Sequence, residues 1–319
     1  MTDAPLTDGT TPTTGRAVRF DHYGDRDVLR VEEVSVREPG PDEVLVEVKA
    51  AGTNPGEAAI RQGFLDSMFP ATFPSGQGSD FAGVVVATGS DVTGRAPGDE
   101  VLGWSWERSS HAEYVVAPAA QVTAKPGPVS WEVAGSLFVA GTTARAAVDA
   151  VSPRAGETIV VSGAAGGVGS IVTQLLVLQG VDVIGIASEG NHDWLRSVGA
   201  RPVAYGDGLR ARIDELAPDG VSALVDTFGE EYVRLGIDLG VPAERIETMI
   251  AFEAAAEVGA QTKGSTDAAS ATVLHDLVML VSHGKLSIPV DSVFALDDVQ
   301  QAFEKLEQHH AHGKIVLVP

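Results

Sequence analysis

The stretch Thr158–Leu176, TIVVSGAAGGVGSIVTQLL, decides the fold of this chain. It joins an apolar β-branched run to a turn with glycines at positions 163, 166, 167 and 169, and an apolar pattern of helical period follows. Glycines let the backbone approach a pyrophosphate closely, and the free N–H groups at the helix N-terminus face its negative charge. The pattern therefore predicts a strand, a glycine turn and a helix that bind a dinucleotide.

A glycine turn alone would also fit an ordinary tight connection in any α/β sheet. The context favours dinucleotide binding, because Val181–Ala187 (VDVIGIA) reads as a second buried strand and completes a strand–helix–strand unit of about 30 residues. The turn residues that we expect at the cofactor are Gly163, Ala165, Gly166, Gly167, Val168 and Gly169.

Composition limits the classes of protein and partner. With 319 residues, 44% of them hydrophobic, the chain exceeds the size at which one core stops growing, so two domains are expected. The absence of cysteine excludes disulfides, thiol nucleophiles and thiolate zinc sites. The net charge of −22 argues against a nucleic-acid partner. Because no apolar run is long enough to cross a bilayer and residues 1–15 lack the pattern of a secretory signal, we expect a cytoplasmic protein without a membrane partner.

The sequence pattern changes along the chain. Residues 1–15 read as a mobile leader, and residues 16–127 contain short β-rich runs separated by turns, which indicates a compact β-rich domain. From residue 128 helical and strand patterns alternate, which is typical of a doubly wound parallel sheet with helices on both faces. The expected fold class is therefore α/β.

Several separate segments carry a family resemblance. They are EVLVEVKAAGTNPGEAAIRQG (43–63), GSDFAGVVVATG (78–89), PGDEVLGW (97–104), HAEYVVAP (111–118), GAAGGVG (163–169) and HGKIVLVP (312–319). In this order they resemble the medium-chain dehydrogenase/reductase superfamily, in its zinc-free quinone oxidoreductase branch. The resemblance implies a GroES-like catalytic domain over 16–127, completed by 282–319, and a Rossmann nucleotide-binding domain over 128–281.

Departures from the family pattern bear on metal chemistry. Zinc-dependent members of the superfamily hold catalytic zinc through cysteine and histidine, whereas Asn54, Ser79 and Asp80 stand in the corresponding stretches here. The cysteine-rich structural zinc lobe is also missing, so we expect no metal site. The quinone oxidoreductase branch usually has an aspartate two residues after the Asn-Pro pair, and this chain has Glu57 instead.

The expected cofactor is NADPH. NAD-specific units usually end the second strand with an acid that pairs with the ribose hydroxyls, but this strand ends at Ile186, Ala187 and Ser188, and Glu189 comes only afterwards. Ser188, Asn191 and His192 could donate hydrogen bonds to a 2′-phosphate; alternatively, they cap the following helix.

The resemblance implies four further cofactor residues. Tyr205 matches a position that flanks the adenine ribose, Thr142 and Phe228 match positions that line the nicotinamide pocket, and Lys314 matches one that approaches the cofactor. A surface charge at the start of the last strand is an equal reading of Lys314.

The expected acceptor class follows from a cofactor that donates hydride in a site without a metal ion. Without a Lewis acid, activated acceptors such as a quinone or an α,β-unsaturated ketone are favoured, since charge delocalises onto a carbonyl oxygen. Asn54 is the candidate catalytic residue, because the resemblance places it close to the nicotinamide; alternatively, Asn54 only fixes the turn before Pro55. Arg61 could polarise a carbonyl, although an ion pair with Glu57 at spacing i, i+4 is the favoured reading.

Two further groups have ordinary alternatives. Trp104 and Trp106 could form a flat wall for an aromatic acceptor or be core and rim residues. Among His309, His310 and His312 only His309 and His312 have the three-residue spacing that puts two ligands on one helix face, and a solvated helix end before Gly313 is the favoured reading.

The leading hypothesis is an NADPH-dependent, zinc-independent reductase of small-molecule quinones or enones. The alternatives are an alkenal or enoyl-thioester reductase of the same fold and a non-catalytic NADPH-binding protein of the crystallin kind. The resemblance further implies a homodimer, in which ERIETMIA (244–251) would be the edge strand.

Overall fold

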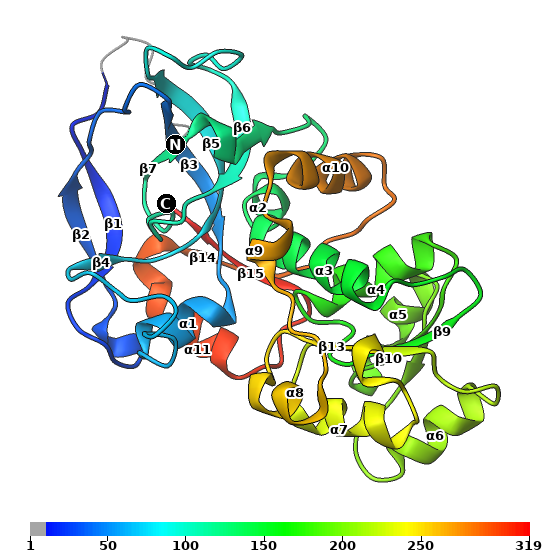
Figure 1. Cartoon of the computed structure of the whole chain (residues 1–319). Helices are drawn as coiled ribbons and strands as arrows, with labels where there is room; N and C mark the ends of the chain where they lie inside the picture. Colours follow the sequence, from blue (N-terminus) through cyan, green and yellow to red (C-terminus); the bar gives the residue numbers. More distant parts are fainter. Residues whose placement is uncertain (1–10) are drawn as a thin grey trace. The chain divides into compact units, whose positions relative to one another are not determined.

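The computed structural model describes residues 11–319, so most of the expected leader lies outside the described residues (Figure 1). The chain divides into two units, one comprising Met1–Ser136, Val293–Glu307 and Ile315–Pro319 and the other Leu137–Ser292 and Gln308–Lys314. The first division lies later than the boundary expected at 127/128. The reason is that Gly135 belongs to the first unit, where its carbonyl accepts the N–H of Gly52 at 2.7 Å.

The first unit contains two sheets. The smaller has the strand order β2-β1-β4, and the larger has the order β14-β15-β3-β5-β6-β8, with β7 paired to β3. The strands are β1 (Thr14–Phe20), β2 (Arg30–Ser35), β3 (Glu43–Gly52), β4 (Ser75–Gly76), β5 (Asp80–Thr88), β6 (Glu100–Trp104), β7 (Tyr114–Pro118), β8 (Val122–Ala124), β14 (Val290–Ala295) and β15 (Lys314–Val318). The helices are α1 (Pro55–Arg61), α2 (Trp131–Ala134) and α11 (Val299–Glu307), with 3-10 turns at Arg26–Val28, Ala119–Gln121 and Leu296–Asp298.

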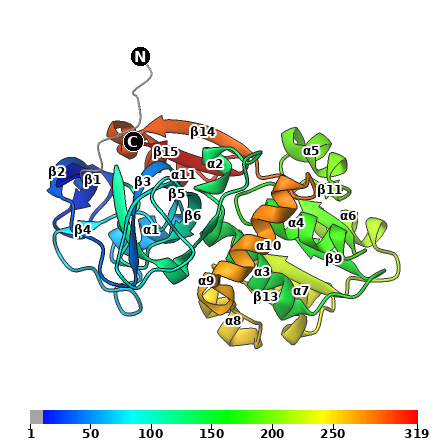
Figure 2. The same ribbon diagram turned by 90° about the horizontal axis from the view of Figure 1, so that it is seen from above.

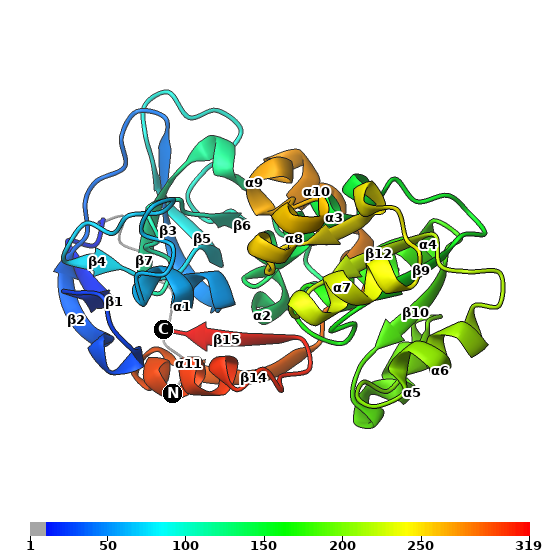
Figure 3. The same cartoon turned by 60° about the horizontal axis from the view of Figure 1, so that its bottom comes forward.

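Strand β3 forms the centre of this unit, because it pairs with β5, β7 and β15. Its Val44, Val46 and Val48 side chains are buried in one apolar cluster with residues of β5, β6 and β7. A Cβ at Gly83 of β5 would lie 2.0 Å from the carbonyl oxygen of Glu47, so the close approach of β5 to β3 requires glycine there. Helix α1 packs against α11 (Figure 3).

The second unit is a parallel sheet covered by helices. Its strands are β9 (Thr158–Val161), β10 (Asp182–Ile186), β11 (Arg201–Val203), β12 (Ala223–Asp226) and β13 (Ile246–Thr248). Its helices are α3 (Phe138–Val151), α4 (Gly169–Leu178), α5 (His192–Ser197), α6 (Leu209–Leu216), α7 (Glu230–Asp238), α8 (Phe252–Val258), α9 (Ser265–Ala268) and α10 (Ala271–Ser282), with 3-10 turns at Glu189–Asn191 and Ala243–Arg245. Helix α10 lies along α3 (Figure 2).

The strand order β11-β10-β9-β12-β13 confirms the predicted doubly wound topology. All four pairings between these strands are parallel, so the carboxyl ends of the five strands lie at one edge of the sheet. The chain order reverses between β9 and β12, and ligands of such sheets bind in the crevice at this switch point. The fold therefore directs attention to the loops after β9 and β12.

Candidate functional site

The glycine turn after β9 is shaped by three glycines with different roles. Gly163 has a φ of +54°, and a Cβ there would lie 2.6 Å from Oγ1 of Thr227. A Cβ at Gly169 would lie 2.1 Å from the carbonyl oxygen of Gly163, so this glycine lets α4 begin directly against the turn. A Cβ at Gly166 would meet only that same oxygen, at 3.2 Å. Packing thus requires glycine at 163 and 169, whereas Gly166 leaves one face of the turn open.

The start of α4 has a free donor. Among the described residues, the N–H group of Val168 donates to no acceptor, and no side chain caps this helix. The N–H of Gly167 instead takes part in the parallel bridge between Gly166 and Gly313. Uncapped N–H groups at a helix N-terminus form a site for an anion, because the helix dipole adds to their charge. The turn Gly163–Gly169, which includes Ala165, therefore has the geometry that a pyrophosphate group needs.

The segment before β15 lies against the same turn. The N–H of Gly313 donates to the carbonyl oxygen of Ala165 at 3.1 Å, and Gly313 forms a parallel bridge with Gly166. Lys314 is buried, and its Cδ lies 3.2 Å from the position of a Cβ at Gly167. The aliphatic part of Lys314 thus packs beside the predicted cofactor turn.

The residues predicted to recognise the 2′-phosphate follow β10. Nδ2 of Asn191 donates to Oγ of Ser188 at 3.1 Å, and Nε2 of His192 lies 3.4 Å from the carbonyl oxygen of Ala187. The side chains of Ser188 and Asn191 make no capping hydrogen bond to the helical turns that begin after them. The alternative that these two residues cap the following helix is therefore wrong. Ser188 is exposed at the carboxyl edge of the sheet.

The other cofactor residues are divided between the sheet edge and a helix. Tyr205 follows β11 and Phe228 follows β12; both rings are about half exposed. The Phe228 ring makes edge contacts with the rings of Tyr232 at 5.9 Å and His309 at 6.5 Å. Thr142 is fully buried in α3, and its hydroxyl donates to the carbonyl oxygen of Phe138 at 2.7 Å. This bond uses the hydroxyl proton of Thr142 inside its own helix.

Sequence reasoning missed Asp226, the last residue of β12. Its side chain is fully buried at the switch point and accepts hydrogen bonds from Ser162 after β9 and from Thr248 of β13. The only sequence signal was an acid at the end of an apolar strand, in ALVD. Such a residue is not expected in a core unless it is fully hydrogen-bonded.

In the first unit Asn54 belongs to a buried polar cluster. Its Nδ2 donates to Oε1 of Glu57 at 3.1 Å and to Oδ2 of Asp80 at 3.3 Å. Glu57 also accepts the backbone N–H groups of Asn54 at 3.0 Å and Ser79 at 2.8 Å. Glu57, which stands where the family usually has an aspartate, therefore uses both carboxylate oxygens as hydrogen-bond acceptors. Its bonds connect the start of α1 to Ser79, the residue before β5.

His111 completes this cluster. Its ring is buried, and Nε2 lies 3.0 Å from the carbonyl oxygen of Gly52 and 3.8 Å from Oε2 of Glu57. Because a carbonyl oxygen can only accept, Nε2 carries the proton of this histidine. Across residues 11–319, no three histidine, cysteine or acidic side chains are grouped as a metal site requires.

The comparisons with known proteins agree with this geometry. Residues 40–127 match the alcohol dehydrogenase GroES-like domain, and residues 198–317 match a family described as zinc-binding dehydrogenase. A 2-methylene-furan-3-one reductase of Solanum lycopersicum is 32% identical over 326 residues, covering 97% of this chain and 80% of the relative. The solved quinone oxidoreductase of Coxiella burnetii is 30% identical, with a TM-score of 0.84, and the match covers 96% of this chain and 99% of that one.

The chain belongs to the medium-chain dehydrogenase/reductase superfamily. It is an NAD(P)H-dependent oxidoreductase of that superfamily, with quinone oxidoreductases among its relatives. The quinone oxidoreductase of Escherichia coli in complex with NADPH shares the fold at 23% identity, with a TM-score of 0.85, and the match covers 95% of this chain and 100% of that one. In the described part of this oxidoreductase, none of the helices is both long and apolar enough to span a membrane.

The predicted ion pair between Arg61 and Glu57 is wrong. In this oxidoreductase Arg61 is fully buried and pairs with Oε1 of Glu307 on α11 at 2.6 Å, with its guanidinium 5.0 Å from the centre of the Phe303 ring. Glu57 is occupied by Asn54 and the Ser79 N–H instead. The i, i+4 spacing failed as a guide because α11, distant in sequence, supplies a better-placed carboxylate.

The histidine group of the oxidoreductase is only partly a solvated helix end. Helix α11 ends at Glu307, and His309 and His310 are exposed, as predicted. His312 differs: its ring packs edge-on against Trp194 at 5.0 Å, and burial lowers its pKa, with Asp291 opposing this shift. The two tryptophans also differ, since Trp104 is buried and Trp106 is 45% exposed, with ring centres 6.3 Å apart.

Strand β13 falls within the predicted edge segment 244–251 and is the last strand of its sheet. Its outer side is already bonded, because Gln261 donates its N–H to Ile246 at 2.8 Å and accepts that of Thr248 at 3.0 Å. A homodimer of the oxidoreductase stays a prediction, and pairing through this edge would involve residues around 261.

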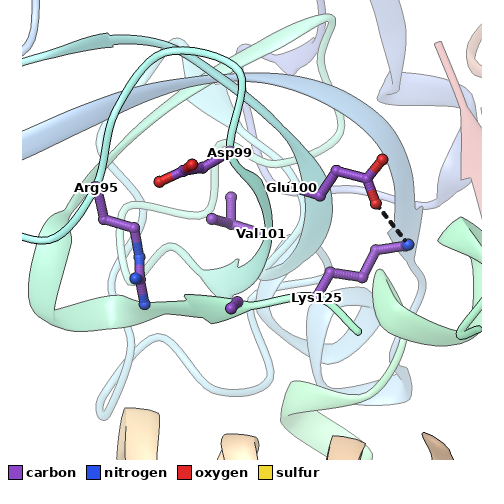
Figure 4. A pocket seen from close by; sticks show the side chains of 6 residues that line it. Arg95, Asp99, Glu100, Val101 and Lys125 are labelled. Atoms are coloured by element: carbon purple, nitrogen blue, oxygen red, sulfur yellow. Dashed lines mark hydrogen bonds and ion pairs between the residues drawn. The ribbon is translucent and has the colours of Figure 1, made fainter. Parts of the chain in front are cut away.

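A separate pocket of about 400 Å³ lies in the first unit beside the paired strands β6 and β8 (Figure 4). Arg95, Asp99 and Val101 line it, together with Glu100 and Lys125, whose charged groups are 2.9 Å apart. None of the predicted site residues lines this pocket.

Proposed function

We propose that this oxidoreductase transfers hydride from NADPH to a quinone or an α,β-unsaturated ketone without zinc. The observation that carries the proposal is the open face of the glycine turn at Gly166, beside the free N–H group of Val168 at the start of α4. Support for the acceptor class comes from the quinone oxidoreductase of Coxiella burnetii and the 2-methylene-furan-3-one reductase of Solanum lycopersicum.

Residues at the carboxyl edge of the parallel sheet are proposed to contact each part of the dinucleotide. The N–H groups of the turn would donate to the pyrophosphate, and Lys314 would support the turn from behind. Tyr205 would flank the adenine ribose, and Phe228 and Thr142 would line the nicotinamide pocket. For Thr142 this would be an apolar wall, because its hydroxyl proton is held by the carbonyl oxygen of Phe138.

The preference for NADPH rests on the tip of β10. Ser188 is exposed there and has no negative charge, so a 2′-phosphate would meet no repulsion from the strand end. The hydroxyl of Ser188 and the amide of Asn191 are 3.1 Å apart, which lets one phosphate accept from both. The NADPH complex of the related Escherichia coli enzyme supports the same choice.

Metal-free chemistry is proposed from the donor set. The chain has no cysteine, and Asn54, Ser79 and Asp80 occupy the stretches where zinc-dependent relatives have ligands. The reduced nicotinamide supplies the hydride when bound, so the protein has only to orient the acceptor and stabilise developing charge. Asn54 is the proposed acceptor-side residue. Because its amide already donates to Glu57 and Asp80, it would act by fixing the loop before α1.

The test is a cofactor and acceptor survey with the full chain. Binding of NADPH and NADH is measured by titration calorimetry, and oxidation of each is then followed with benzoquinones, enones, enoyl thioesters and simple aldehydes. Turnover of NADPH with quinones or enones and not with aldehydes is expected. Preference for thioesters would support the enoyl-thioester alternative, and tight NADPH binding without any turnover would support the non-catalytic one.

A further inference from the structure

One carboxylate, that of Asp226, connects the ends of three strands in the second unit. Its Oδ1 accepts from Oγ of Ser162, which follows β9, at 2.5 Å. Its Oδ2 accepts from Oγ1 of Thr248, which ends β13, at 2.7 Å. The backbone N–H groups of Phe228 and Gly229 donate to Oδ1 at 2.9 and 3.1 Å. Asp226 therefore holds groups from β9, β12 and β13 at once.

The partners of Asp226 bond onward to the loops at the carboxyl edge. Oγ of Ser162 accepts the N–H of Thr227 at 2.9 Å, and the hydroxyl of Thr227 donates to the carbonyl oxygen of Ser162 at 2.8 Å. These bonds join the loop after β12 to the residue just before Gly163. Oγ1 of Thr248 accepts the N–H of Ala251 at 3.0 Å, in the loop after β13.

A buried carboxylate without a cation is costly unless hydrogen bonds satisfy it. Among the described residues no cation forms an ion pair with Asp226, and its two oxygens accept from two hydroxyls and two backbone N–H groups. A connected and fully satisfied buried network rigidifies its members. An apolar residue at position 226 would fill the same space without the cost of burying a carboxylate. The hydrogen-bond network therefore indicates that the loops after β9, β12 and β13 must be held in fixed positions.

The two segments that Asp226 holds are the loops after β9 and β12, and ligands of doubly wound sheets bind between such loops at the switch point. On one side Ser162 leads directly into the turn at Gly163, and on the other Phe228 follows β12. We propose that Asp226 is a positioning residue for dinucleotide binding, which fixes the glycine turn through Ser162 and the loop after β12 through the N–H groups of Phe228 and Gly229. This inference rests on the proposed function, because it needs a dinucleotide at that switch point.

The network contains its own matched control. Ser162 and Thr248 each donate one hydroxyl hydrogen bond to Asp226, and both side chains are fully buried. Only Ser162 is attached to the glycine turn. Ser162→Ala and Thr248→Val each remove one bond to the carboxylate, so a purely structural role predicts similar losses of stability and no difference between them in NADPH binding.

The experiment measures the dissociation constant of NADPH by titration calorimetry and the unfolding midpoint by circular dichroism for wild type and both variants. Ser162→Ala is expected to raise the dissociation constant roughly tenfold, which corresponds to the loss of one buried hydrogen bond, and Thr248→Val to change it less than about twofold. Equal dissociation constants for the two variants would overturn the inference.

Two further variants test the carboxylate itself. Asp226→Asn keeps an acceptor for Ser162 and the two N–H groups, so it should bind NADPH more tightly than Asp226→Ala. If Asp226→Ala binds as well as wild type, Asp226 positions nothing. Failure of the wild-type protein to bind NADPH or NADH would instead refute the proposed function, so the two failures are distinguishable.

Discussion

The substitution Glu247→Gln should make this protein more stable, and increasingly so as the pH rises. Glu247 is fully buried in β13, where Oε1 accepts the N–H of Lys263 at 2.6 Å and Oε2 has no partner among the described residues. Burial raises the pKa of Glu247 to about 8; the Lys263 N–H opposes this shift, and Asp267 adds to it. The folded protein therefore holds a proton on this group that the unfolded chain releases at a much lower pH.

The magnitude follows from proton linkage. Because the folded pKa exceeds the unfolded value of 4.5, the stabilising contribution of Glu247 is complete below pH 4.5 and is lost as the pH rises toward 8. Each pH unit in this window costs about 1.4 kcal/mol, so the loss at pH 7 is on the order of 3 kcal/mol. Glutamine mimics the protonated acid without titrating. The gain from Glu247→Gln should thus be close to zero near pH 4.5 and largest at pH 8.

The assay is urea unfolding of wild type and Glu247→Gln, followed by far-ultraviolet circular dichroism at intervals from pH 4.5 to 8.5. Taking the difference between the two proteins removes the titration of all other groups. Glu43→Gln provides a control whose effect should not change within this pH range, because the hydrogen bond from Arg37 lowers the pKa of Glu43 to about 2. Its stabilisation is present above pH 4.5 and is lost as the pH falls toward 2. A difference for Glu247→Gln that does not change with pH would refute the reasoning.

The remaining predictions concern the site. Gly166→Asp should fold with the unfolding midpoint of the wild type and lose NADPH binding, as measured by calorimetry. Gly169→Ala should instead lower the unfolding midpoint, because its Cβ would lie 2.1 Å from the carbonyl oxygen of Gly163. The same result for both variants would contradict the assignment of Gly166 to cofactor binding and of Gly169 to packing. Ser188→Asp should raise the dissociation constant of NADPH at least about tenfold and leave that of NADH nearly unchanged, because a carboxylate at the strand tip repels only the 2′-phosphate. Exhaustive chelation should leave quinone reduction intact, and a loss that added zinc restores would disprove metal-free chemistry.

The nucleotide-binding half of the fold was predictable because its signals are local. The β-branched run of β9, the glycines of the turn and the apolar period of α4 are contiguous in sequence, and each residue type favours the backbone conformation that it adopts. The edge position of Ser188 also followed, because it was predicted at the end of the second strand and parallel strands share one carboxyl edge. Tyr205 and Phe228 were assigned by the family resemblance alone. The division of the chain was less predictable, since it depends on hydrogen bonds such as that from Gly52 to Gly135.

The sequence by itself therefore determined the α/β class, the glycine turn and the position of Ser188 at the end of the second strand. Only the tertiary structure decided which side chains meet. Arg61 pairs with Glu307, which is 246 positions away, and Asp226 binds Ser162 across 64 positions. The physical reason is that secondary structure depends on the conformational preferences of neighbouring residues, whereas the partner of a buried charge is whichever group the packing of distant elements brings within hydrogen-bond distance.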